Sequence, residues 1–331
     1  MKKELFGYLP SGKAIYSYEF GNERLTATVI TYGAAVQKLV SYGRDVIGGF
    51  DTIDGYLADD GHQGAIVGRY ANRIKDARFT LNGKVYELER NCEGKHHLHS
   101  GSAGLCKKLW EAEVLGENAL LLRTIAADGD GNYPGNLQVS VRYTIEDDCL
   151  SIAYEAMTDK ETPVNITNHM YFNLDGLGGD ILEHQVQIFA SGVSEIDEDL
   201  TPTGTILPTR GTIFDFTIPH TIGERLDDRF GGYDHNYLLD GDRIGRAPTL
   251  AAIVENTDRR LSVLTNRPCM QFYIGNSMNG THNFKNNIRQ VIHGAFCLET
   301  QFAPYSIVSG ECMLKAGETF SSETIYKIEK R

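Results

Sequence analysis

The chain has 331 residues, of which 41% are hydrophobic and 23% are charged. This composition excludes a disordered polypeptide, and the length suffices for one large domain with an extensive core. The formal net charge of −12, with no Lys/Arg run longer than a pair, argues against nucleic acid or an anionic membrane surface as a partner and favours a neutral small molecule.

Cysteine usage and the N-terminal segment point to the cytoplasm. The six cysteines are scattered without a CxxC pair, which favours reduced thiols over a disulfide framework or a structural zinc site. The first residues lack the apolar stretch of a signal peptide, and no run approaches the roughly 18 apolar residues of a membrane-spanning helix. We therefore expect a cytoplasmic protein without a membrane span, as a monomer or a homodimer.

Strand patterns dominate the chain from its N-terminal part onward. Residues 25–40 are rich in Thr, Val, Ile and Tyr and are broken at Gly33. Residues 137–145 alternate apolar and polar side chains, and the pattern resumes at 150–156, which predicts a hairpin with one face in the core. Further strands are expected at residues 119–125, 184–190, 251–254, 261–265, 271–274 and 295–298.

Helical periodicity is confined to two short segments, residues 54–58 and 221–230. The 35 glycines and nine prolines are spread along the chain, as many tight turns require. There is no linker, low-complexity tract or repeat of fixed period. We expect a mostly β protein, a large antiparallel β-sandwich with a few short helices, in a single domain over residues 1–331.

The first candidate for chemistry is the segment Gly-Arg-Tyr-Ala-Asn-Arg-Ile at residues 68–74. Arg69 and Arg73 are four residues apart, with Asn72 between them. A guanidinium offers five fixed donors that suit sugar hydroxyls or a carboxylate. Either one of the two arginines lies in a cleft and the other outside it, or they brace a loop.

Three histidines follow closely, His96, His97 and His99. On a strand, His97 and His99 would share a face, as pairs of metal ligands often do. However, no carboxylate stands at a recognisable ligand spacing and there is no HExxH motif. We therefore expect no metal, one functional histidine, and exposed turn positions for the others.

Residues 165–174 are too polar for a core strand and too apolar for a loop. A strand can carry such a run if its polar residues line a cleft and its aromatic residues anchor the other face. The amides next to His169, such as Asn168, would then set the tautomer that acid–base catalysis needs. The alternative is a core histidine satisfied by local hydrogen bonds.

Residues 233–237 place Asp234 between two tyrosines after a pair of glycines. Asp234 would accept hydrogen bonds from ligand hydroxyls, and Tyr233 or Tyr237 would form an apolar wall for a sugar. The alternative for this segment is an Asx-turn.

Glu299 follows the apolar strand expected at residues 295–298. Desolvation at the end of such a strand would raise its pKa from about 4.3 toward that of a useful base. The alternative is a carboxylate at the rim that points to water. Gln271 likewise places an amide within an apolar strand.

These segments together resemble the aldose 1-epimerase (galactose mutarotase) family nearly from end to end. Residues 165–174 match the family signature Asn-x-Thr-Asn-His-x-Tyr-Phe-Asn-Leu at all eight specified positions. The family motifs Gly-Arg-x-Ala-Asn-Arg-Ile, Leu-His-x-Gly, Asp-His-Asn and Leu-Glu-Thr-Gln occur in the family's order, at residues 68–74, 98–101, 234–236 and 298–301.

The resemblance implies a large β-sandwich with an open cleft that binds a free monosaccharide without a cofactor. It implies that this cleft is lined by Arg73, His99, His169, Asp234 and Glu299, with Asn72 and Gln271 as secondary contacts. The chain departs from the family pattern at residues 61–64, Gly-His-Gln-Gly instead of Pro-Tyr-Phe-Gly, and at residues 302–305, Phe-Ala-Pro-Tyr instead of Asn-Phe-Pro-Asp. Both departures are expected beside the cleft, where they bear on the preferred sugar.

The expected reaction is exchange of the α and β anomers of an aldose of the glucose or galactose type. Glu299 would act as the base at O1 and His169 as the acid at the ring oxygen, while Arg73, His99 and Asp234 position the sugar. Four other functions compete. They are a glycoside hydrolase that uses Glu299 and Asp234, a sugar-phosphate epimerase, a non-catalytic sugar-binding protein on the same fold, and a metal hydrolase built on His96, His97 and His99.

Overall fold

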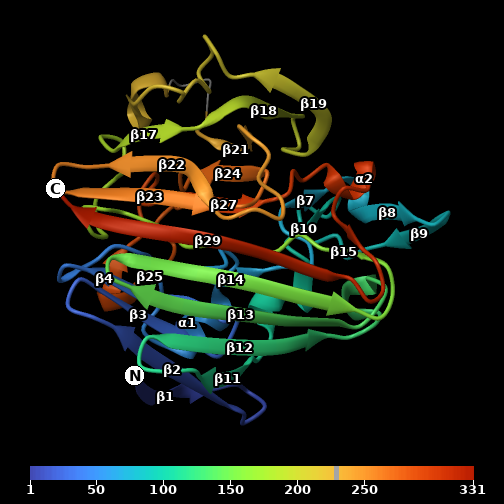
Figure 1. The fold of residues 1–331 in the computed structure, drawn as a ribbon, viewed down its shortest axis with the longest axis horizontal. Coiled ribbons are helices and arrows are strands. Elements are labelled where there is room, and N and C mark those ends of the chain that lie inside the picture. Colours follow the sequence, from blue (N-terminus) through green and yellow to red (C-terminus); the bar gives the residue numbers. More distant parts are fainter. Residues whose placement is uncertain (227–230) are drawn as a thin grey trace.

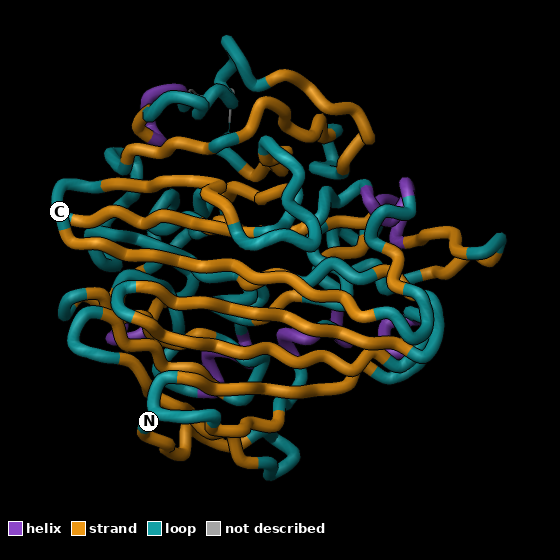
Figure 2. Tube along the Cα trace, viewed as in Figure 1, coloured by secondary structure: helices purple, strands orange, loops and turns teal. Residues whose placement is uncertain are grey.

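The computed structural model describes residues 1–226 and 231–331, and strands make up most of its regular structure (Figures 1 and 2). The largest sheet has nine strands, all antiparallel, and crosses the view of Figure 1. In spatial order its strands are β11 (Glu111–Val114), β12 (Ala119–Ala126), β13 (Leu137–Glu146), β14 (Cys149–Thr158), β29 (Thr319–Lys330), β23 (Arg259–Thr265), β22 (Thr249–Glu255), β17 (Gln185–Ile188) and β20 (His220–Thr221).

Two five-stranded sheets accompany it, one from each half of the chain. The N-terminal sheet consists of β1 (Lys2–Tyr8), β2 (Ala14–Gly21), β3 (Leu25–Ile30), β4 (Val36–Ser41) and β5 (Arg44–Asp45). The second sheet runs in the order β19 (Pro202–Pro208), β18 (Ala190–Ile196), β21 (Asp234–Leu239), β24 (Cys269–Tyr273) and β27 (Cys297–Gln301).

The remaining strands form short antiparallel pairs in the connections. These pairs are β6 (Ile66–Val67) with β16 (Thr167–Asn168), β7 (Arg73–Ile74) with β10 (His97–Leu98), β8 (Arg78–Leu81) with β9 (Lys84–Glu87), β15 (Thr162–Pro163) with β28 (Met313–Leu314), and β25 (Asn283–Phe284) with β26 (Ile288–Arg289). Helices are few and short: α1 (Ile53–Ala58), α2 (Ser306–Ser309) and 3₁₀ turns at Lys75–Ala77, Gly101–Ala103, Leu105–Lys107, Asp130–Asn132, Ile222–Arg225 and Lys285–Asn287.

The expected strands are present, and the predicted hairpin is β13–β14, with Ile145 opposite Leu150. Residues 25–40 divide into β3 and β4 around Gly33, as the break in the pattern predicted. Residues 184–190 do not form one strand, because the chain leaves the nine-stranded sheet after β17 and enters the second five-stranded sheet at β18. The helix expected at 54–58 is α1, whereas that expected at 221–230 is a 3₁₀ turn over Ile222–Arg225, and residues 227–230 lie outside the described residues.

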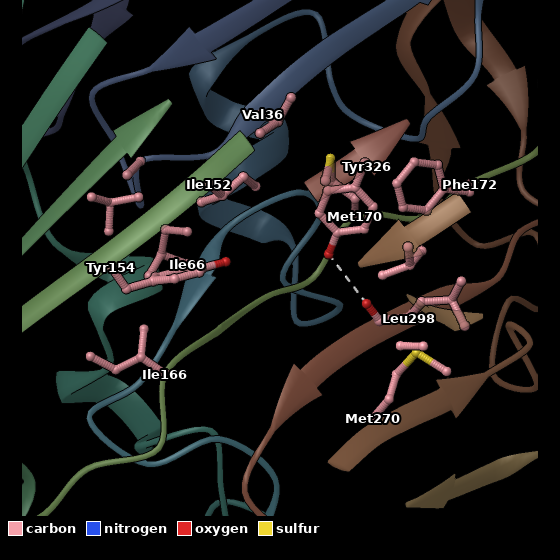
Figure 3. Packing of buried hydrophobic residues seen from close by; sticks show 14 of the residues in the cluster. Val36, Ile66, Ile152, Tyr154, Ile166, Met170, Phe172, Met270, Leu298 and Tyr326 are labelled. Atoms are coloured by element: carbon pink, nitrogen blue, oxygen red, sulfur yellow. Dashed lines mark hydrogen bonds between the residues drawn. The ribbon is translucent and has the colours of Figure 1, made fainter. Parts of the chain in front are cut away.

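A continuous core lies between the nine-stranded sheet and the two smaller sheets (Figure 3). Ile152 and Tyr154 of β14 point into it, together with Tyr326 of β29, Val36 of β4 and Leu298 of β27. The Tyr326 hydroxyl also donates a hydrogen bond to the Leu298 carbonyl at 3.2 Å. The inward side of β27 is therefore anchored on the nine-stranded sheet.

All six cysteines carry free thiols, as their spacing predicted. None of the helices in residues 1–226 and 231–331 has the length and apolar composition needed to cross a membrane.

Candidate active site

A cavity of about 220 Å³ opens beside β27 and contains nearly all of the predicted functional residues. Its wall includes Asn72, Arg73, His99, His169, Asp234 and Glu299. Drug-sized ligands occupy sites of roughly 300–1,000 Å³, so this smaller volume suits a single sugar ring. A larger hollow of about 520 Å³ on the outer face of β12–β14 has no histidine in its lining. The smaller cavity is therefore the candidate active site.

Strand register assembles one wall of this cavity. Gln271 lies directly opposite Glu299 across β24 and β27, and Tyr273 lies opposite both Asp234 and Cys297. Directly opposite residues in a sheet project to the same face, as do residues two apart along a strand. On β27, Thr300 faces β29 and contacts Thr324, so Glu299 points to the other side, toward the cavity. The sequence predicted Glu299 at the end of a strand, but it lies in the middle of β27 because this strand begins at Cys297 and continues to Gln301.

Asp234 and Arg73 form a half-buried ion pair at the cavity wall. Arg73 Nη1 donates to Asp234 Oδ2 at 3.2 Å, and Gln271 Nε2 donates to Asp234 Oδ1 at 2.7 Å. Both carboxylate oxygens of Asp234 are thus held by donors from two other strands. The segment around Asp234 is strand β21 and not an Asx-turn. A carboxylate whose two oxygens both accept from side-chain donors suits the acceptance of sugar hydroxyls better than the donation of a proton as a hydrolase acid.

Glu299 is 2% exposed, which rules out a rim carboxylate in contact with bulk water. Its Oε1 lies 3.6 Å from His169 Nε2, and its Oε2 has no hydrogen-bond partner among the described residues. Burial and the negative charge of Asp234 raise the pKa of the Glu299 carboxyl well above its ordinary value, against a smaller effect of Arg73. An unpartnered oxygen on such a carboxyl is available to accept a proton from a ligand.

His169 is oriented by ring contacts and not by the amides next to it in the sequence. Its ring stacks on Tyr171 with centroids 4.9 Å apart, and its Nδ1 lies 3.5 Å from Cys297 Sγ. Burial lowers the pKa of His169 to about 4. The expectation that amides fix its tautomer was wrong, because the Asn168 amide donates to the Gly64 carbonyl and accepts from the Met170 N–H.

The other signature asparagines also brace the backbone. Asn165 accepts a hydrogen bond from the Phe302 N–H at 2.8 Å, and Asn173 donates to the Gly294 carbonyl at 2.9 Å. Only Thr167–Asn168 of the segment 165–174 is a strand, paired with β6. These side-chain amides add to the backbone hydrogen bonds of the segment, such as that from the His169 N–H to the Ala65 carbonyl at 3.0 Å. Together they fix the backbone from which the His169 ring faces the cavity.

His99 presents its Nε2 to the cavity. The backbone N–H of Asn72 donates to His99 Nδ1 at 3.0 Å, so in the neutral ring the proton resides on Nε2. Burial keeps the pKa of His99 well below its ordinary value. His99 can therefore donate one hydrogen bond to a ligand oxygen.

His96 and His97 are buried, whereas the sequence predicted exposed turn positions. His97 Nδ1 lies 2.7 Å from the Glu89 carbonyl, and His96 Nδ1 accepts from the Asp76 N–H at 3.0 Å. Strand β10 ends at Leu98 and His99 adopts φ of 53°, so His97 and His99 do not share a face. His96 and His97 therefore stabilise the local fold.

Donor atoms of His99, His169 and Glu299 lie within 4.8 Å of one another, close enough to consider a metal ion. The residues do not fit one well. His99 Nδ1 is occupied by the Asn72 N–H, and its Nε2 would have to lose its proton to become a ligand. The donor set therefore suits hydrogen bonding to a neutral ligand better than metal coordination.

The sequence did not identify several cavity residues. Tyr171 and Tyr273 form the aromatic wall that was assigned to Tyr233 and Tyr237, which are buried in the core instead. His62 and the rim residue Leu200 also line the cavity. Period-two alternation from Gln271 could have indicated Tyr273, and from His169 it could have indicated Tyr171, but no local pattern points to His62 or Leu200.

The two segments that depart from the family pattern, residues 61–64 and 302–305, lie differently with respect to the cavity. Gly61 and His62 line the cavity, whereas none of residues 302–305 does. Phe302 is buried against Arg267, with the guanidinium 4.6 Å from the ring centroid. Only the first departure is therefore in contact with the site.

Comparison with known proteins gives a consistent assignment. The family model described as Aldose 1-epimerase matches residues 16–327. The chain is 38% identical to galactose mutarotase of Rattus norvegicus over 98% of this chain and 97% of that protein. It is 35% identical to aldose 1-epimerase of Escherichia coli K12, over 92% of each chain.

Solved structures agree with this result. The crystal structure of galactose 1-epimerase from Lactobacillus acidophilus superposes with a TM-score of 0.87 at 27% identity, over 99% of this chain and 98% of that chain. The GalM/aldose epimerase homologue of C. elegans gives a TM-score of 0.86 at 26% identity, over 95% of this chain and 99% of that chain. The chain belongs to the aldose 1-epimerase family of isomerases.

Proposed function

We propose that the protein interconverts the α and β anomers of a free aldose of the glucose or galactose type, with Glu299 as the base at O1 and His169 as the acid at the ring oxygen. The observation that carries this proposal is the buried pair itself, with His169 Nε2 and Glu299 Oε1 3.6 Å apart in a cavity of sugar size. Ring opening needs one group to take a proton from O1 and another to supply one to O5, and the pair provides both.

The proposed steps conserve protons. Glu299 takes the proton of the C1 hydroxyl as the C1–O5 bond breaks, and protonated His169 delivers its proton to O5. The open aldehyde rotates about C1–C2, and closure on the other face reverses both transfers. No covalent intermediate or redox step is involved, so the pair is regenerated after each cycle.

Burial of Glu299 and His169 shifts their pKa values in the directions that favour ring opening. It raises the pKa of Glu299 and lowers that of His169, so the buried pair favours its neutral form with one shared proton. The reactive ion pair differs only in the position of that proton. When Glu299 takes the O1 proton and His169 gives its proton to O5, both groups become neutral. Ring opening therefore returns the site to the charge state that burial favours.

The positioning groups complete the proposal. His99 would donate its Nε2 proton near the ring oxygen, and the ion pair of Asp234 with Arg73 would hold ring hydroxyls, supported by Gln271. Asn72 supports this arrangement because its N–H orients His99. Fixed donors and acceptors of this kind lower the entropic cost of bringing the reacting atoms together.

Polarimetry of freshly dissolved α-D-glucose or α-D-galactose tests the assignment. We expect Glu299→Gln and His169→Asn each to lower kcat by about 10²–10⁴-fold, the contribution of one positioned acid or base. Wild-type turnover in either variant would contradict the role of that residue.

Two controls separate the competing functions. An aryl glycoside, whose anomeric centre is locked, should not be cleaved, because release of the aglycone requires a hydrolase. A chelator should leave the rate unchanged, since neither transfer is assigned to a metal. Sugar binding without any acceleration of mutarotation would indicate a binding protein instead.

A further inference from the structure

His62 lies in the cavity on a turn that is held by hydrogen bonds. Asp59 accepts from the N–H groups of Gly61 and Gln63, each at 2.9 Å, and the Ala65 N–H donates to the His62 carbonyl at 3.0 Å. His62 adopts φ of 59°, a left-handed conformation that non-glycine residues rarely take. The turn therefore fixes the position from which the imidazole enters the cavity.

The imidazole of His62 stands beside the two histidines already assigned. Its ring centroid is 4.8 Å from that of His99 and 6.1 Å from that of His169. Among the described residues, none hydrogen-bonds to a ring nitrogen of His62, whereas His99 Nδ1 accepts from the Asn72 N–H and His169 Nδ1 lies near Cys297 Sγ. Burial lowers the pKa of His62 to about 3, so the ring is neutral near pH 7 and offers one donor and one acceptor.

The position of His62 relative to the sugar follows from the proposed function, on which this inference rests. In an aldopyranose, O5 lies between C1 and C5. With Glu299 at O1 and His169 at O5, the next atom around the ring is C5, which carries the C6 group. His62 lies against His169 and His99, whereas the charged neighbours of Glu299 are Asp234 and Arg73.

We propose that His62 hydrogen-bonds the C6 hydroxyl of the sugar and so favours aldohexoses over 6-deoxyhexoses and aldopentoses. A hydroxyl both donates and accepts, as does a neutral imidazole. A sugar without O6 would leave the His62 nitrogens unpartnered in a desolvated site, which is unfavourable.

The test is a specificity ratio. Mutarotation of D-galactose and of D-fucose, its 6-deoxy analogue, is followed by polarimetry, and kcat/KM for the first is divided by that for the second. We expect the wild type to favour D-galactose and His62→Phe to lower the ratio by about tenfold, the effect of one uncharged hydrogen bond. His62→Gln, which keeps a donor and an acceptor, should recover part of the ratio.

A matched control is His220→Phe, since His220 lies outside the cavity and pairs with Glu224. It should leave the ratio at the wild-type value. A wild-type ratio near one, or a ratio that His62→Phe does not change, overturns the role of His62 even if absolute rates fall. Absence of acceleration for every sugar by the wild type would instead overturn the proposed function.

Discussion

At the scale of single residues, the proposed chemistry depends on one proton shared by Glu299 and His169. Because the two groups interact, their titration belongs to the pair and not to either residue alone. The active form carries one proton. A second proton blocks the base, and loss of the shared proton removes the acid.

This reasoning predicts a bell-shaped dependence of kcat/KM on pH. The acid limb reflects protonation of His169, whose pKa is lowered to about 4, and the alkaline limb reflects loss of the proton held by Glu299, whose pKa is raised well above its ordinary value. Asp234 contributes to the raised pKa of Glu299. We therefore expect Asp234→Asn to move the alkaline limb to lower pH, in addition to any loss of sugar binding.

The position of the limb, not the height of the profile, is the quantity to compare. Asp242→Asn is a suitable control, because Asp242 is exposed and pairs with Arg246 away from the cavity. An alkaline limb that stays in place in Asp234→Asn would show that the limb does not report Glu299.

At the scale of elements, two arginines of one segment have opposite roles. Arg73 reaches the cavity, whereas Arg69 is buried and ties β6 to the connection between β12 and β13. Its guanidinium donates to the carbonyls of Ala126 at 3.1 Å and Gly135 at 2.9 Å, and to Thr162 Oγ1 at 2.9 Å. This contact set holds the segment that leads into Asn72 and Arg73.

We expect Arg69→Met to lower the free energy of unfolding by about 3–5 kcal/mol, because several buried carbonyl groups lose their charged donor, at roughly 1–3 kcal/mol each. Arg69→Lys should recover little, since an ammonium group cannot reproduce the planar fork of donors. Urea denaturation followed by circular dichroism measures both changes.

The matched control is Arg123→Met. Arg123 is exposed and pairs with Glu113, so its replacement should change the free energy of unfolding by at most about 1 kcal/mol. Equal effects of the Arg69 and Arg123 substitutions would contradict a bracing role for Arg69.

At the scale of the whole molecule, one cluster of buried apolar side chains contains residues from all three large sheets. Val29 represents the N-terminal sheet in it, Ile152 the nine-stranded sheet and Phe272 the second five-stranded sheet. Sheets that share a core lose their packing together.

We therefore expect a single cooperative unfolding transition over residues 1–331. Trp110, the only tryptophan, is 1% exposed and donates its backbone N–H to the Thr31 carbonyl, next to the N-terminal sheet. Its fluorescence should change at the same denaturant concentration as the far-ultraviolet circular dichroism, which reports all strands. Two separate midpoints would instead indicate two domains.

Much of this architecture was predictable because many strands show a local alternation of apolar and polar residues. The hairpin β13–β14 places apolar residues at every second position, and its burial follows the same period. The C-terminal strand β29 also alternates, with Phe320, Tyr326 and Ile328 buried, yet it was not among the strands predicted from the sequence. Local patterns already indicated His169, Asp234 and Glu299, whereas the choice of Arg73 over Arg69 and of His99 among three histidines came from the resemblance to a family.

The sequence by itself determined the class of fold, the family and the types of side chain available for chemistry, because these depend on local periodicity and on short motifs. Only the tertiary structure decided which side chains meet. Pairing of β21, β24 and β27 placed Gln271 beside Asp234 and Glu299, and left-handed turns brought His62 and His99 together while His97 was buried elsewhere. Strand register and turn direction arise from long-range packing, which no local pattern in the sequence specifies.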